Sequence, residues 1–379
     1  MGGSAFKDPN IPIVRLTPIQ YDQICTQLTN ILNNYYNRVS VPPSAPDKPS
    51  HGDIDILVLP HPSYFPIPPP QLATRLKASA HLNNGLQMQF ALPLTAYTTP
   101  NHPIENGSGA NMETGEIVKE NVHFQVDINI CTSTQHFSWY VTRYSYNSLF
   151  SLLGAMGKSY GLSLHETGLS LFIAEFDATP WSRPSRLPVI NMDADAIFSV
   201  FGLDVAAYHA GFDTLEGLFD WLTVSPLFYR GTFLDEHEEE KAADRKRKER
   251  WMEKQFITVY LPARPHLGVK SDSNNASARR EEIAEKLIEQ FDLEQKYKQT
   301  VLMFRMQESV EQMWRDVAKG VPKEGKELAE LMKVLREWWK KHKEKIGVYQ
   351  GAEVMIRDWE KIVAEKRLRQ AGGAVKKEG

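Results

Sequence analysis

Hydrophobic residues recur with two different periods in the first part of this chain. After Thr17-Pro18, a pair that suits the cap and the first position of a helix, apolar residues recur at helical spacing as far as Tyr35. Residues 122–131 instead alternate strictly between apolar and polar side chains, and residues 53–59 form a short apolar run that begins with acidic residues. These patterns predict an amphipathic helix followed by two strands, the second of which has one buried face.

The segments around these elements predict how the chain is organised. Residues 60–70 contain six prolines and cannot lie inside a sheet, whereas residues 99–121, rich in Asn, Gly and Pro, indicate a hairpin tip or an insertion. A helix at 147–160 and a strand at 169–173 follow, and the pattern after Asp193 is almost entirely helical. The helices expected there span residues 213–222, 240–257, 277–305, 324–345 and 352–370. We therefore expect an α/β (α+β) protein with an all-helical C-terminal region.

Charge is distributed unevenly, although the net charge of the chain is only −3. Residues 1–240 hold 12 basic and 24 acidic side chains, whereas residues 241–379 hold 32 basic and 23 acidic side chains. Such an asymmetry is typical of a folded body joined to a part that binds an anionic partner.

Composition excludes several classes of protein. Hydrophobic residues make up 42% of the chain and charged residues 24%, which is typical of a globular protein. No apolar run approaches the roughly 20 residues that cross a bilayer, and the N-terminus lacks a targeting signal, so we expect no membrane partner. The two cysteines, Cys25 and Cys131, cannot form a disulfide framework, and no Cys/His cluster has zinc spacing. We expect a reducing, intracellular compartment, either cytoplasmic or nuclear.

Three acidic residues are the most informative candidates for chemistry. Residues i and i+2 of a strand point the same way, so Asp53 and Asp55 should project together from one face of the first strand. Asp127 lies in the middle of the polar face of the second strand, and the three carboxylates would converge if the strands are neighbours. Hard oxygen ligands at this spacing suit Mg²⁺ or Mn²⁺. Taken alone, an Asp-x-Asp at a strand start is also common as a turn residue followed by a solvent-facing acid.

These acids resemble the signature of the DNA polymerase β-like nucleotidyltransferase superfamily, which has Gly-Asp-x-Asp on one strand and a third Asp on a neighbouring strand. Here the signature is Gly52-Asp53-Ile54-Asp55 with Asp127. A closer likeness, over residues 1–265, is to the nucleotidyltransferase-like proteins of phages and large DNA viruses. The further positions that carry it are Gly2-Gly3-Ser4-Ala5, Arg15, Lys48, Gly168-Leu169 and Ser225-Pro226-Leu227-Phe228.

The resemblance implies both a fold and an activity. The implied fold is a palm-like domain with a mixed sheet at residues 1–190, a helical domain packed on the palm at residues 191–265, and a basic helical extension at residues 266–379. The implied activity is the metal-dependent transfer of a nucleoside monophosphate from an NTP to an acceptor hydroxyl, with RNA or DNA as the expected class of acceptor. The first two acids would bind both metal ions, and Asp127 would hold the catalytic ion and help the acceptor to lose its proton.

The sequence departs from the superfamily where the phosphates of the nucleotide are expected to bind. Most members have a Gly-Ser turn before the first Asp, and this chain has Pro42-Pro43-Ser44 there. Because proline has no N–H, the usual phosphate site cannot form in the usual way. The residues that we expect to bind the nucleotide instead are Lys48, Ser50, Gly52, Gly2, Gly3, Ser4 and Tyr146. His51 could contact a phosphate or only cap the turn.

A strongly basic segment follows an acidic run beyond residue 240. Its candidate nucleic-acid-binding cations are Arg245, Lys246, Arg247, Lys248 and Arg250. Acids at the start of a helix and bases further along suit the helix dipole, so an ordinary solvated helix is one explanation. The functional alternative is a surface that binds the phosphates of a nucleic acid acceptor.

Three kinds of function stay open at this point. The first is an enzyme that adds nucleotides to an RNA or DNA end, which the presence of all three acids favours. The second is a non-catalytic module that binds nucleic acid, or a protein partner through its C-terminal helices, which the missing Gly-Ser turn favours. The third is transfer of a nucleotide to a protein side chain, which would use the same site.

Overall fold

The computed structural model describes residues 3–63, 66–98, 122–173, 186–234, 250–268 and 276–375. The chain forms two compact units, the first made of residues 1–177 and 188–287 and the second of residues 178–187 and 288–379. It is a mixed α/β protein with a mixed sheet and C-terminal helices, so the fold class expected from the sequence is confirmed. The expected hairpin tip or insertion at 99–121 and the first part, residues 240–249, of the helix expected at 240–257 lie outside the described residues.

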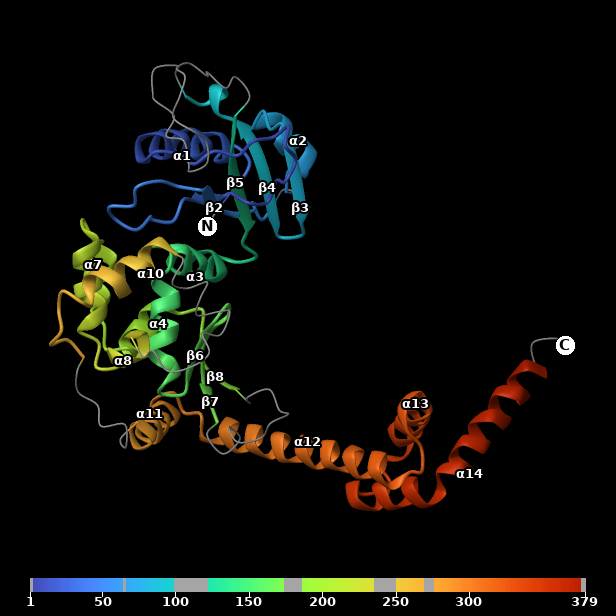
Figure 1. The fold of residues 1–379 in the computed structure, drawn as a ribbon. Helices are drawn as coiled ribbons and strands as arrows, with labels where there is room; N and C mark the ends of the chain where they lie inside the picture. Colours follow the sequence, from blue (N-terminus) through green and yellow to red (C-terminus); the bar gives the residue numbers. More distant parts are fainter. Residues whose placement is uncertain are drawn as a thin grey trace. The chain divides into compact units, whose positions relative to one another are not determined.

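The first unit is built on a five-stranded sheet. Its strands are β1 (Arg38–Ser40), β2 (Asp53–Leu59), β3 (Ala80–Asn84), β4 (Gln87–Pro93) and β5 (His123–Ile130). They lie in the order β1-β2-β5-β4-β3 (Figure 1). β2 and β5 run parallel, whereas the other neighbouring pairs are antiparallel. The parallel pair consists of the two strands that the sequence predicts.

The central strand β5 is buried on both faces, so the expectation of a single buried face is wrong. The polar side chains of Gln125 and Asp127 are only 3% and 7% exposed. One reason is that the N-terminal residues lie against this face, where the backbone N–H of Ala5 donates to Gln125. Buried amide and carboxyl groups need hydrogen-bond partners, so this face of β5 must hold a polar network.

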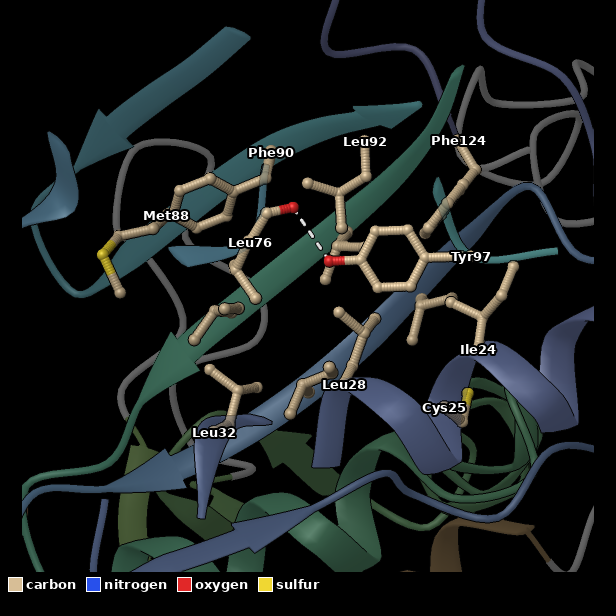
Figure 2. Close-up of a cluster of buried hydrophobic side chains, with 14 of the residues drawn as sticks. Ile24, Cys25, Leu28, Leu32, Leu76, Met88, Phe90, Leu92, Tyr97 and Phe124 are labelled. Atoms are coloured by element: carbon tan, nitrogen blue, oxygen red, sulfur yellow. Dashed lines mark hydrogen bonds between the residues drawn. The ribbon is translucent and has the colours of Figure 1, made fainter. Parts of the chain in front are cut away.

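The first helix, α1 (Pro18–Leu32), begins where the sequence predicts. The hydroxyl of Thr17 accepts the N–H of Gln20, and the Gln20 side chain accepts the N–H of Thr17, which forms a capping box. The apolar face of α1 packs against the sheet in a core drawn in Figure 2. Its members include Ile24, Leu28, Leu32, Phe90 and Phe124, and the hydroxyl of Tyr97 in the same core donates to the carbonyl of Leu76 over 2.8 Å.

A three-stranded sheet and further helices complete the first unit. The sheet has the strands β6 (Leu162–His165), β7 (Gly168–Phe172) and β8 (Arg186–Asn191), in that order. The helices are α2 (Pro69–Arg75), η1 (Leu94–Ala96), α3 (Thr134–Tyr144), α4 (Leu149–Lys158), α5 (Ala194–Val200), α6 (Val205–Ala210), α7 (Leu215–Thr223), α8 (Gly231–Leu234), α10 (Trp251–Gln255), the π-helix η3 (Phe256–Tyr260) and α11 (Ala276–Gln290). α4 and β7 confirm the helix expected at 147–160 and the strand expected at 169–173.

The described helices that lie entirely within the second unit are α12 (Glu294–Gly320), α13 (Gly325–His342) and α14 (Val348–Val375) (Figure 1). Their shared core includes Met313, Val317, Leu335, Trp339 and Met355. α13 confirms the helix expected at 324–345. The single helix expected at 352–370 is wrong, because the backbone of Asp358 (φ −112°, ψ 17°) is not helical and α14 is two helices joined by a kink there. None of the described helices is long and apolar enough to cross a membrane.

The single helix expected at 277–305 is wrong, because the chain breaks inside that range. α11 ends at Gln290, Asp292 adopts a positive φ of 49°, and α12 then continues to Gly320. A residue with a positive φ interrupts a right-handed helix, and Asp adopts this conformation more readily than most residues do. The apolar periodicity on both sides of the break conceals it in the sequence.

The core between α1 and the sheet makes a testable contribution to stability. Leu28→Ala removes a fully buried side chain and leaves a cavity, so we expect the free energy of unfolding of the first unit to fall by about 2–5 kcal/mol in urea titrations. Ile19→Ala on the same helix is the matched control, because Ile19 is 58% exposed, and it should change the value by at most about 0.5 kcal/mol. Equal losses in the two variants would contradict the packing of α1.

Candidate functional site

The parallel pairing of β2 with β5 brings two of the acids side by side. Asp53 lies opposite Gln125, and Asp55 lies opposite Asp127. Paired residues of neighbouring strands share one face of the sheet, at a strand spacing of about 4.8 Å. β2 and β5 are therefore neighbouring strands. The sequence predicts that the carboxylates converge only if this condition is met.

The carboxyl group of Asp55 lies in an unfavourable environment for a negative charge. The residue is half-buried and lines a cavity. Burial, the largest cause, and the negative charges of Asp53 and Asp127 together raise its pKa to about 8, against the opposing effect of the Lys48 cation. A carboxyl group in this position gains more than an exposed one from a bound cation.

Both carboxylate oxygens of Asp127 accept hydrogen bonds from amide side chains. Nε2 of Gln125 donates to Oδ1 over 2.7 Å, and Nε2 of Gln89 on β4 donates to Oδ2 over 3.2 Å. Burial nevertheless raises the pKa of Asp127 above its ordinary value, against the effect of the two amides. In the part of the chain that the structure describes, no group of three or more His, Cys, Asp or Glu side chains is arranged to hold a metal ion.

A cavity of about 690 Å³ opens beside the acids of β2. Asp53 and Asp55 line it, whereas Asp127 is not among the lining residues. Four cationic side chains line the same cavity, namely Arg15, Lys48, Arg143 and Arg250. A cavity that combines acids with a larger number of cations suits a polyanion that carries a divalent cation.

Arg15 and Lys48 approach the cavity from the chain segments on either side of α1 and β1. Arg15 donates from Nε to the hydroxyl of Ser50 and from Nη2 to the Ser50 carbonyl, both over 2.9 Å, which fixes the guanidinium group. Burial lowers the pKa of Lys48, against the attraction of Asp53. No carboxylate of the described residues forms a salt bridge with Lys48. A partly buried cation without such a partner is a favourable contact for a phosphate.

Other residues that line the cavity come from α3, from β6, and from α10 with the residue before it. Arg143 lies over the ring of Tyr140, 5.9 Å from the ring centroid. Arg250 contacts the buried carboxylate of Glu253 over 3.4 Å. His165 is held by the hydroxyl of Ser170, 2.6 Å from Nε2. Each of these three side chains therefore contacts a neighbouring residue that restricts its orientation.

Of the N-terminal candidates, the structure places Gly3 at the acids. The N–H of Gly3 lies 3.3 Å from Oδ2 of Asp53, and Ser4 is exposed. Gly52 and Ser50 line the cavity. Gly2 and the cations 245–248 lie outside the described residues, whereas Arg250 lines the cavity.

Two other candidates do not reach the cavity as nucleotide ligands. The ring of Tyr146 packs against Tyr208 and Phe212, and its neighbours Tyr144 and Asn147 line the cavity instead. His51 is 4% exposed and stacks on Tyr21 with ring centroids 3.8 Å apart. Burial lowers the pKa of His51 to about 3, so its imidazole is neutral and offers no positive charge to a phosphate.

Several lining residues were not candidates in the sequence. Arg143 and His165 come from segments far from the acids, and no motif marks them. Asn147 has a local signal, because it follows Tyr146 in a turn where both residues adopt a positive φ. Its side chain accepts the N–H of Ala45 over 3.0 Å, which braces the loop before β2.

The acids at this site fit a divalent cation chemically. They offer hard carboxylate oxygens on one face of the sheet, and the pKa of Asp55, raised first by burial and then by the charges of Asp53 and Asp127, marks a cost of ionisation that a bound cation would offset. Each oxygen of Asp127 accepts one amide hydrogen bond and keeps a further lone pair with which it could join them.

No protein-family model matches the chain, and no curated protein matches it either. The interpretation of the site therefore depends on the geometry and on the motifs of the sequence.

The raised pKa of Asp55 predicts a pH-dependent stability. The pKa of Asp55 has its ordinary value of 3.8 in the unfolded chain and is about 8 in the folded protein, so the folded state favours the protonated carboxyl group. The resulting stabilisation is complete below the lower value and is lost as pH rises through the higher one, by at most about 1.4 kcal/mol per pH unit. We expect the thermal midpoint in chelator to fall less between about pH 5 and pH 8 in Asp55→Asn than in the wild type. Identical pH dependence in both proteins would contradict this account.

Proposed function

We propose that this protein is a metal-dependent nucleotidyltransferase whose first unit contains a polymerase β-like palm. The observation that supports this most strongly is the pairing of Asp55 with Asp127 on parallel strands, beside a cavity lined by four cations. A nucleoside triphosphate bound with Mg²⁺ or Mn²⁺ carries both kinds of charge that the cavity complements.

In the proposed reaction an acceptor hydroxyl oxygen attacks the α-phosphorus of the NTP. The new P–O bond forms as the bond to the β-phosphate oxygen breaks, and pyrophosphate leaves with the electron pair. Mg²⁺, when bound, would neutralise charge on the phosphates and acidify the acceptor hydroxyl. Asp53 and Asp55 would hold the cations. Asp127, whose pKa is raised by burial, would hold the catalytic cation and help remove the hydroxyl proton.

Side chains would replace the missing Gly-Ser turn in binding the phosphates. The loop with Pro42-Pro43 is braced by backbone contacts, since the N–H of Tyr146 donates to the carbonyl of Pro43 over 2.6 Å. Lys48 follows this loop, and Ser50 anchors Arg15 at its end. Two cations held there can supply the charge that backbone amides supply elsewhere in the superfamily.

The proposed acceptor is the 3′ or other free hydroxyl of a nucleic acid. Support comes from the excess of basic residues after residue 240 and from Arg250 at the cavity. A protein side chain would use the same chemistry, so the acceptor has to be found by experiment.

A second candidate function is a module that binds nucleic acid or a protein partner without catalysis. The specific observation in its favour is that both oxygens of Asp127 are engaged by amides. Such a module would bind its partner without any requirement for NTP.

The direct test is transfer of label from each NTP, with Mg²⁺, to total RNA, DNA or protein. Asp53→Asn should lower transfer by at least about 100-fold, because it removes a charge from the cation site. Asp213→Asn, at an exposed carboxylate, is the matched control and should retain activity. Full transfer by Asp53→Asn would refute the assignment, and binding of nucleic acid with no transfer by the wild type would favour the non-catalytic module.

Lys48 supplies a separate test of phosphate binding. Lys48→Met keeps the length of the side chain but removes its charge, so the affinity for NTP measured by calorimetry should fall about 10-fold or more, which corresponds to about 1.4 kcal/mol or more. Lys158→Met removes an exposed cation at the end of α4 and should leave the affinity unchanged. Equal affinity in the Lys48→Met variant would exclude this lysine from the phosphate site.

A further inference from the structure

The N-terminal arm, residues 3–16, is attached to both strands that carry the acids. The N–H of Val14 donates to the carbonyl of His123, at the start of β5, over 2.8 Å. Leu16 and His51 exchange two backbone hydrogen bonds of 2.8 and 2.9 Å just before β2. The arm therefore continues the hydrogen-bonding of the sheet at the ends where Asp53 and Gln125 lie.

The beginning of the arm requires glycine. Gly3 has a positive φ of 79°, and a Cβ built on it would overlap the carbonyl oxygen of Gly52. This close approach places the N–H of Gly3 at Oδ2 of Asp53. Any side chain at this position has to move the arm away from the first acid.

Two residues later the arm determines the orientation of a buried amide. The backbone N–H of Ala5 donates over 2.9 Å to Oε1 of Gln125, whose side chain is buried. An N–H can only donate, so the oxygen of the amide must face the arm. The NH₂ group then faces Asp127 and donates to Oδ1 over 2.7 Å.

We propose that Gln125 is a positioning residue for Asp127. The N-terminal arm sets the orientation of the Gln125 amide through Ala5 and the orientation of the Asp53 carboxylate through Gly3. This role depends on the proposed nucleotidyl transfer, because the two acids are cation ligands in that reaction. The arm thus completes the cation site from a part of the chain distant in sequence. Outer partners of metal-ligating carboxylates commonly change metal affinity or activity by about 10–100-fold when they are removed.

The chain offers a matched pair of glycines to test the arm. Gly85, in the turn between β3 and β4, has a positive φ of 77° and nothing within 4 Å of an added Cβ. Gly3→Ala and Gly85→Ala therefore share the backbone cost, but only the first displaces the arm. Mn²⁺ binding to the full-length chain is measured by electron paramagnetic resonance. We expect Gly3→Ala to weaken it about 10-fold or more and Gly85→Ala to leave it within about 2-fold.

Gln125→Met tests the amide separately, because Met has a similar length but neither donates to Asp127 nor accepts from Ala5. We expect kcat for transfer to fall about 10–100-fold with KM for NTP within about 2-fold, since binding depends on Lys48 and Arg15. The thermal midpoint of each variant is recorded, and Gln125→Glu, which can still accept from Ala5 but cannot donate to Asp127 as a carboxylate, should show the same loss.

The outcomes separate this proposal from the proposed function. Wild-type protein that binds Mn²⁺ and transfers nucleotides, with Gly3→Ala and Gln125→Met variants that behave like Gly85→Ala, overturns the role of the arm alone. Wild-type protein that binds Mn²⁺ but transfers nothing overturns the proposed function, while the Mn²⁺ affinities of the variants still decide the role of the arm. Wild-type protein that binds no Mn²⁺ overturns both.

Discussion

The burial of carboxylates side by side is the constraint on which this structure depends. Asp55 and Asp127 lie at paired positions of two parallel strands, and each has a raised pKa because water has been removed around it. A fold under selection for stability alone would place apolar residues there, as it does on the opposite face with Ile54 and Val126. The surrounding cations and amides are arranged in ways that offset this cost.

The offset differs between the two carboxylates. Asp127 accepts two amide hydrogen bonds, and its neighbours Gln125 and Gln89 come from β5 and β4. Asp55 faces a cavity in which Lys48 is the opposing cation. One acid is therefore satisfied by the protein itself, and the other gains from whatever cation enters the cavity.

Much of the fold was predictable, because local signals agreed with the tertiary structure. Thr17 and Gln20 form the predicted helix start, and the alternation of residues 122–131 identifies β5. β3 and β4 were missed, because β3 is short, largely polar and exposed and β4 ends in Pro93. Without β4 the sequence could not place Gln89 beside Asp127.

The acids of the site were predictable from the sequence, but the contacts that surround them were not. Alternation determines which side chains share a face of a strand, so the acids were found, but it does not determine which strands are neighbours or the contacts across them. Gln125 was only one polar residue of an alternating strand, and its role depends on the N–H of Ala5, which is 120 positions away. The fit between Gly3 and Gly52 likewise exists only in the folded chain.

The central claim is that these acids form a cation site for a nucleotide. Anomalous diffraction from crystals grown with Mn²⁺ and a non-hydrolysable NTP analogue tests it most directly. The account predicts anomalous peaks bridging Asp53, Asp55 and the phosphates, with one peak also within bonding distance of Asp127. Ordered nucleotide at the cavity without a peak at these carboxylates, or Mn²⁺ peaks only elsewhere on the chain, would contradict it.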